Sequence, residues 1–281
     1  MQLKSVSSSI IILANGVIRY PIRNFTERIT MAKLTRITGY LNAILTPQNI
    51  EDYCPNGLQV EGSEDVQKII TGVTASQELV DAAVDQQANL LLVHHGYFWK
   101  GEPQNIVGIK KRRLKTLLAN DISLLAYHLP LDVHPEFGNN AQLAKVLGWK
   151  MEEAALINGM PPLVRSTVLD AAMSGEEMAA HLTQKISREP MHIAANREIK
   201  KVAWCTGAAQ SYLQRAVKAG ADAFISGEIS EQTVHEAREN NIHYFAAGHH
   251  ATERYGVKAL GQKLAEKFNL QTTFVDCDNP V

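Results

Sequence analysis

Imidazole and carboxylate side chains follow several strand-like runs of this sequence, and together they could bind metal ions. They are His94, His95, His128, Asp132, Glu228, His249, His250 and Glu253. His128 and Asp132 have the same His-x-x-x-carboxylate spacing as His249 and Glu253. Nitrogen and oxygen donors without a thiolate suit Zn²⁺, Mn²⁺ or Fe²⁺ at an open site, and they argue against a structural zinc clip.

The number of possible ligands favours a pair of ions over a single ion. His94 and His95 are adjacent, and adjacent residues of an extended chain point to opposite sides, so we expect them to reach different ions. Asp132 and Glu253 could bridge two ions, which generally lie about 3.5 to 4 Å apart. For any single cluster the alternative is a hydrogen-bonded structural histidine or a solvated i, i+4 pair.

The elements that must position these residues alternate in βαβ order. Strand-like and helical segments of the first series are 69–73, 77–86, 89–93, 110–119 and 122–127. The second series is 201–205, 210–219, 223–226, 231–239 and 243–247. The repeated order predicts an α/β fold of two similar units that arose by internal duplication. Open α/β sheets bind ligands at the carboxyl ends of their strands, which is where the polar clusters lie.

The chain divides into four predicted parts. Residues 1–30 fit no core element and are interpreted as an N-terminal extension that is disordered or not native. Residues 31–150 form the first α/β half, and residues 151–198 a connecting segment with accessory strands and a helix. Residues 199–281 form the second half, in which apolar spacing from Val257 to Phe268 predicts a closing helix before a final strand.

The composition is that of a globular protein and excludes several function classes. The chain has 281 residues, 45% of them hydrophobic, and a formal net charge of -1, which offers no global attraction for nucleic acid or anionic membranes. The three cysteines, Cys54, Cys205 and Cys277, show no paired spacing, and no apolar run is long enough to span a membrane. We therefore expect a cytoplasmic protein. No glycine-rich phosphate loop follows any predicted strand.

Longer motifs surround the polar residues and run in order along the chain from about Met31. They are Asn56-Gly57-Leu58-Gln59-Val60, His94-His95-Gly96-Tyr97-Phe98-Trp99-Lys100-Gly101, His128-Leu129-Pro130-Leu131-Asp132, Gly138-Asn139-Asn140, Ser226-Gly227-Glu228 and Gly248-His249-His250-Ala251-Thr252-Glu253. With these motifs the sequence resembles the NIF-three-like family of dinuclear-metal proteins, often labelled GTP cyclohydrolase I type 2 homologues.

The resemblance implies two interlocked α/β units, with two divalent metal ions (Zn, Fe or Mn) in the cleft between them, and assembly into a toroidal homohexamer. Carried over by position, the family's metal ligands fall on His94, His95, Asp132, His249 and Glu253. His128, His250 and Glu228 have no assured ligand role in the family pattern. We interpret these three as candidate catalytic residues that orient ligands or move protons.

Two functions from different classes follow from these expectations. A pair of divalent ions lowers the pKa of bound water and favours hydrolysis, so the first is a metal-dependent hydrolase acting on a nucleotide or related small molecule. The family label implies attack on the guanine base of GTP with release of formate. The alternative is a non-catalytic protein that binds or delivers metal, or an oligomeric adaptor. DNA binding ranks third, because no recognition motif is visible.

Overall fold

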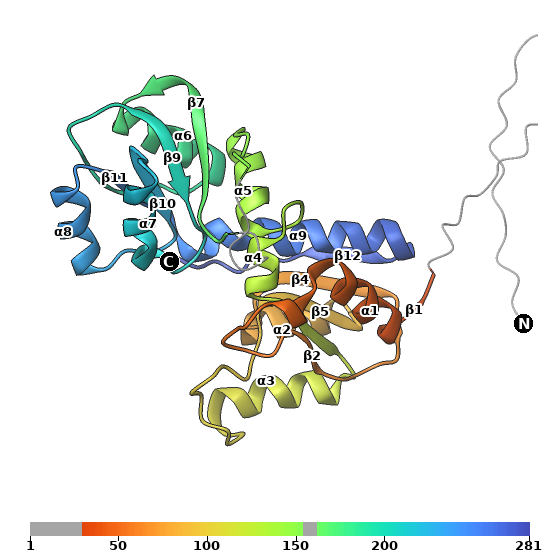
Figure 1. Ribbon diagram of the computed structural model, residues 1–281. Helices are drawn as coiled ribbons and strands as arrows, with labels where there is room; N and C mark the ends of the chain where they lie inside the picture. Colours follow the sequence, from red (N-terminus) through yellow and green to blue (C-terminus); the bar gives the residue numbers. More distant parts are fainter. Residues whose placement is uncertain (1–29, 154–161) are drawn as a thin grey trace, which may run out of the picture.

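The computed structural model describes residues 30–153 and 162–281. Nearly all of the predicted N-terminal extension lies outside the described residues. The rest forms two lobes, each built on a five-stranded sheet with helices packed against it (Figure 1). The predicted α/β fold of two similar units is therefore confirmed.

The first sheet has the strand order β12-β4-β5-β6-β2. Its strands are β2 (Gly57–Val60), β4 (Lys68–Thr74), β5 (Leu90–His95), β6 (Ser123–Ala126) and β12 (Gln271–Phe274). Strands β12, β4, β5 and β6 run parallel, whereas β2 joins the edge of β6 in the antiparallel direction. All four residues of the apolar run 90–93 are fully buried, as expected for a strand covered on both faces.

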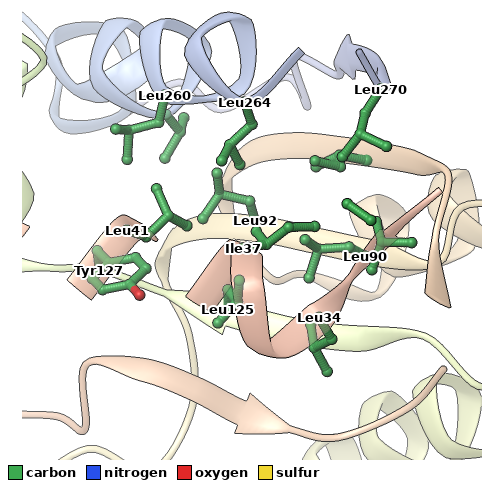
Figure 2. Packing of buried hydrophobic residues seen from close by; sticks show 14 of the residues in the cluster. Leu34, Ile37, Leu41, Leu90, Leu92, Leu125, Tyr127, Leu260, Leu264 and Leu270 are labelled. Carbon is green, nitrogen blue, oxygen red and sulfur yellow. The ribbon is translucent and has the colours of Figure 1, made fainter. Parts of the chain in front are cut away.

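Helices on both faces of the first sheet provide that cover. Helices α2 (Gln77–Asp85) and α3 (Gly108–Ala119) pack on one face, around Leu91 and Val93. Helices α1 (Leu34–Leu45) and α9 (His249–Phe268) pack on the other. Figure 2 shows Leu260 and Leu264 of α9 beside Leu92 of β5, with side chains of α1 completing the cluster.

The second sheet has the order β7-β9-β10-β11-β8. Its strands are β7 (Arg165–Met173), β8 (Met191–Ile193), β9 (Ile199–Trp204), β10 (Ala223–Ser226) and β11 (His243–Ala246). Helices α7 (Leu213–Lys218) and α8 (Glu231–Glu239) flank it, as do α5 (Asn139–Leu147) and α6 (Gly175–Ile186). Strands β7 and β8 and helix α6 lie within residues 151–198, the predicted connecting segment.

The two sheets repeat one arrangement, with a difference at one edge. Three central parallel strands are followed by an antiparallel edge strand, which is β2 in the first sheet and β8 in the second. The opposite edge strand is parallel in the first sheet (β12) and antiparallel in the second (β7). Because β12 belongs to the first sheet although it ends the chain, the lobes interlock, and the sheets cut across the half boundaries predicted from the sequence.

Short elements connect the larger ones. They are β1 (Ala32–Lys33), β3 (Asp65–Val66), α4 (Leu129–Val133) and the 3₁₀ helices η1 (Pro47–Asn49) and η2 (Gln210–Tyr212). The helix expected at 210–219 is divided between η2 and α7. Local sequence fixes some starts: Ser174 and Glu177 form a reciprocal cap on α6. Among the described helices, none has both the length and the apolar character needed to cross a bilayer.

Candidate metal centre

The predicted ligands lie where parallel strands of the two sheets end. His94 and His95 are the last residues of β5, and Asp132 lies in α4, directly after β6. His249 begins helix α9 after β11, and Glu253 lies one turn later on the same helix. Since α9 starts in the second lobe and packs on the first sheet, it carries second-half residues to the end of β5 (Figure 1).

One group of ligand atoms is formed by His94, Asp132 and Glu253, all of which are buried. His94 Nε2 lies 3.5 Å from Asp132 Oδ1 and 3.5 Å from Glu253 Oε1. The other ring nitrogen, Nδ1, lies 2.9 Å from the carbonyl oxygen of Tyr127, so it carries the hydrogen and donates. That bond leaves Nε2 facing the two carboxylates.

A second group of ligand atoms is formed by His95, His249 and Glu253. Glu253 Oε2 lies 3.2 Å from His95 Nε2 and 3.1 Å from His249 Nε2. Thr74 Oγ1 lies 3.0 Å from His95 Nδ1 and fixes that ring from behind. Glu253 therefore takes part in both groups, one through each carboxylate oxygen, as a bridging ligand would.

Some ligand atoms of these groups lie close together without forming hydrogen bonds to one another. His94 Nε2 and Glu253 Oε2 are buried and have oppositely charged neighbours nearby, yet neither has a hydrogen-bond partner. Native proteins rarely leave buried polar atoms unsatisfied. A cation in each group would satisfy these two atoms, and imidazole and carboxylate are the usual donors to such a cation, so these residues fit divalent metal.

The two carboxylates have opposite pKa shifts. Burial opposes ionisation of Glu253, but His94, His95 and His249 outweigh it and hold its pKa well below the ordinary value. Burial raises the pKa of Asp132, and the nearby His94 only partly compensates. A proton in the metal-free centre is therefore held by Asp132 in preference to Glu253.

The histidines also differ from one another. Burial disfavours the charged form of His94, but Asp132 and Glu253 outweigh it and raise the pKa of His94 to about 9. Burial likewise opposes charge on His249, whereas Glu253 and Glu228 raise its pKa to about 9. Burial and the neighbouring imidazoles lower the pKa of His95 to about 3. The centre thus has one neutral imidazole beside two that hold protons until a cation displaces them.

The three residues predicted as catalytic lie at different places. Glu228 Oε1 contacts His249 Nδ1 at 2.7 Å, behind the face that His249 presents to Glu253. The His128 ring centroid lies 5.0 Å from that of His94 and 5.7 Å from that of His95. His250 turns its Nε2 to Asp276 at 2.7 Å, and none of the ligand groups found in the described chain includes it. A catalytic role for His250 stays a prediction without a supporting contact.

Several residues that support the centre were missed in the sequence. Asn139 Nδ2 donates to Asp132 Oδ1 at 2.9 Å, and Asn139 Oδ1 accepts from the Gly256 N–H at 3.0 Å. Gly207, with a φ of +71°, lies where a Cβ atom would collide with Glu253. Asp52 contacts His128. Asn139 belongs to the Gly138-Asn139-Asn140 motif, and a glycine soon after a strand indicates close approach of another segment, so each position carries a signal in the sequence.

Comparison with known proteins identifies the family. The sequence pattern of the Duf34/NIF3 (NGG1p interacting factor 3) family matches residues 32–280. The chain belongs to the Duf34/NIF3 family. One NIF3 relative, the GTP cyclohydrolase 1 type 2 homolog of Pseudomonas aeruginosa, is 56% identical over 247 residues, which are 88% of this chain and 98% of the relative. The Escherichia coli protein of the same name is 51% identical over 250 residues, covering 88% and 99% of the two chains.

Solved structures of NIF3 proteins share the fold. A structure described as protein ybgI, of unknown function, has a TM-score of 0.85 and 50% identity, and the alignment covers 89% of this chain and 100% of that one. TTHA1606 from Thermus thermophilus has a TM-score of 0.77 and 34% identity, with coverage of 89% and 100%. The resemblance stated from the motifs is confirmed.

Proposed function

We propose that this NIF3 protein binds two divalent metal ions and uses them to hydrolyse a nucleotide or a related small molecule. The observation that carries the proposal is the position of Glu253, whose two oxygens face separate groups of buried ligand atoms. His94 and Asp132 would complete one site, and His95 and His249 the other. Ions held in this way would lower the pKa of bound water and would supply a nucleophile at neutral pH.

The protein's own residues would orient the centre and handle protons. Glu228, at 2.7 Å from His249 Nδ1, keeps the opposite nitrogen of that ring directed at Glu253. Glu228 is partly exposed, so it can also exchange protons with solvent. The nucleotide substrate class rests on the names of the relatives, which are called GTP cyclohydrolase 1 type 2 homologs.

Metal analysis and a substrate panel test the proposal. The full chain, purified without chelating resin, is analysed for bound metal and then incubated with GTP, other nucleotides and phosphate esters while formate and phosphate are measured. We expect turnover that is lost in Asp132→Ala and Glu253→Ala. Stoichiometric metal without turnover would instead support the alternative, a metal-binding or metal-delivery protein. Absence of bound metal would overturn both.

A toroidal homohexamer is part of the same proposal. Exposed apolar side chains near α3, at Ile106, Val107, Ile109 and Leu118, offer a surface that self-association would cover. Light scattering coupled to size-exclusion chromatography should give the mass of six chains, and a monomeric mass would contradict this part of the proposal.

A further inference from the structure

We propose that Asp52 is a positioning residue that presents His128 to the metal centre as an additional ligand. In the first half, Asp52 would orient His128 toward the metal centre, as Glu228 orients His249 in the second half. The inference rests on the proposed function, since it assigns a further donor to the same centre.

Asp52 is held rigidly, as a positioning residue must be. Its side chain is 3% exposed. Oδ1 contacts His128 Nδ1 at 2.7 Å and accepts from the Tyr53 N–H at 2.6 Å. Oδ2 accepts from Asn56 Nδ2 at 2.8 Å and from the Leu129 N–H at 2.9 Å. The carboxylate therefore ties the loop before β2 to the start of α4, with no freedom to turn away from the imidazole.

The bond to Asp52 determines which nitrogen of His128 is available. A carboxylate on Nδ1 holds the hydrogen there, so the lone pair of the neutral ring lies on Nε2. His128 forms a group with His94 and His95 in which one ligand atom from each lies within 4.8 Å of the others. Trp99 and the His128 ring pack in a T-shaped arrangement at a centroid distance of 5.0 Å. His128 is thus oriented from two sides and lies beside the predicted ligands.

The second half contains the same device. His249 also lies four residues before a ligand carboxylate, and Glu228 also contacts its Nδ1 at 2.7 Å. Carboxylates behind metal-binding histidines commonly fix the ring and increase its basicity. The two histidines, one in each half, share the spacing to a ligand carboxylate and a 2.7 Å contact between Nδ1 and a second carboxylate, and one role for both best explains this.

Strand register explains why the supporting carboxylates come from different places. Val93 pairs with Ala126 in the first sheet, and Ser226 pairs with Ala246 in the second, so these positions correspond. Two residues further along β5 and β10, the first half has His95 where the second has Glu228. After β6 and β11, His128 lies two residues past the paired position and His249 lies three. Because His95 occupies that position, a carboxylate for His128 must come from elsewhere, and Asp52 supplies it.

Metal titrations of paired variants test the proposal. The metal-free full chain is titrated with Co²⁺, following the visible absorption of the bound ion, and with Zn²⁺ against a chromophoric chelator. We expect Asp52→Asn to weaken one of the binding steps by roughly 10- to 100-fold and to change the Co²⁺ spectrum. If Asp52 acts through His128, the double variant Asp52→Asn/His128→Ala will bind no more weakly than His128→Ala alone.

Asp222→Asn is the matched control. Asp222 is also buried, also accepts from backbone N–H groups, those of Lys200 and Lys201, and forms an ion pair with Arg197. It lies in the second lobe, and the described structure gives it no contact to an imidazole that could serve as a ligand. The affinity of the Asp222→Asn variant for Co²⁺ should stay within about twofold of that of the unaltered chain. The comparison separates the loss of carboxylate hydrogen bonds to the backbone from the loss of imidazole orientation.

Four results would overturn the proposal. One is that the unaltered chain binds metal and that Asp52→Asn has the same metal affinity and the same Co²⁺ spectrum. That result would leave the proposed function intact. Another is additive losses in the double variant. If Asp52→Asn does not fold, ¹⁵N-histidine spectra of the unaltered chain decide: hydrogen on His128 Nδ1 and a shift of Nε2 on metal addition support the proposal, and hydrogen on Nε2 overturns it. Absence of metal binding by the unaltered chain would overturn this proposal and the proposed function together.

Discussion

Glu253 is the residue on which both groups of the centre depend. It is 3% exposed and lies within 3.5 Å of nitrogens from His94, His95 and His249. The same carboxylate thus compensates imidazolium charge in the metal-free protein and would bridge cations in the loaded one. Its replacement should affect stability and metal binding separately, which makes the two roles distinguishable.

Glu253→Gln should remove bound metal and destabilise the metal-free protein. A glutamine keeps the shape but leaves buried imidazolium charge uncompensated, at a cost of about 3 kcal/mol in the free energy of unfolding. Elemental analysis measures the metal, and urea denaturation measures the stability. Glu266→Gln, an exposed change on the same helix, is the control and should match the unaltered chain. Full metal occupancy in Glu253→Gln would contradict the bridging role.

Metal affinity should rise with pH because protons and cations compete for the same nitrogens. The pKa of His94 and that of His249 are raised to about 9, so both rings are protonated in neutral solution and must lose a proton to bind metal. Affinity therefore increases from about pH 7 to about pH 9 and then levels off. His95, with a pKa lowered to about 3, adds nothing in this range.

Calorimetry with Mn²⁺ in buffers of different protonation enthalpy measures this proton release directly. The exposed His235 provides the control, since His235→Ala should leave the number of released protons unchanged. Metal binding without proton release near neutral pH would contradict the pKa values assigned to His94 and His249.

At the scale of elements, the loop between β9 and η2 packs against the start of α9 beside the metal centre. Gly207 donates its N–H to Thr252 Oγ1 at 3.1 Å, and its carbonyl oxygen accepts from the Gly227 N–H at 2.8 Å. The loop can approach α9 this closely because the residue has no side chain and adopts a positive φ of +71°. The close approach positions the start of α9, and Glu253 lies one turn further along that helix.

Gly207→Ala should therefore weaken metal binding, by roughly tenfold or more, because the added Cβ displaces Glu253. Gly220→Ala is the matched control. Gly220 has the same φ of +71° but nothing within 4 Å of an added Cβ. Both variants carry a backbone strain of about 1 kcal/mol, so only the steric effect differs between them. Metal titration and thermal denaturation of the two proteins make the comparison, and equal affinities would refute it.

At the scale of the whole molecule, α9 and β12 link the lobes into one unit. Helix α9 carries His249 and Glu253 at its start and buries Val257, Leu260 and Leu264 against the first sheet. Strand β12 then joins that sheet beside β4. A change in the first core is therefore transmitted to the second lobe through a continuous helix.

Leu260→Ala should lower the free energy of unfolding by about 3 kcal/mol and preserve a single transition. Leu260 is fully buried in the first core, whereas Trp149 and Trp204 pack together in the second. In a Trp99→Phe background the remaining tryptophans, Trp149 and Trp204, lie in the second lobe. Urea denaturation followed by their fluorescence should therefore detect the loss of stability that Leu260→Ala causes in the first core. The exposed change Gln262→Ala should alter stability by less than about 0.5 kcal/mol. Separate transitions for circular dichroism and fluorescence would indicate independent lobes.

Local sequence patterns predict much of the fold and the location of the candidate metal centre. Apolar runs such as 90–93 and helical spacing such as that of Leu260 and Leu264 predicted the main elements, since burial imposes a period on each. The repeated βαβ order predicted two similar units, and the position of polar residues after strands predicted where the centre lies. The His-x-x-x-carboxylate spacing and the surrounding motifs identified the predicted ligands and the family.

Only the tertiary structure decided which residues surround those ligands. Asp52 meets His128, Asn139 meets Asp132 and Gly207 meets Glu253 through contacts between segments far apart in the chain. It also placed β12 in the first sheet and turned His250 toward Asp276. A sequence pattern reports the period of an element and the chemistry of its side chains. Contacts between distant segments depend on how the elements pack, because packing alone determines which loops and side chains meet.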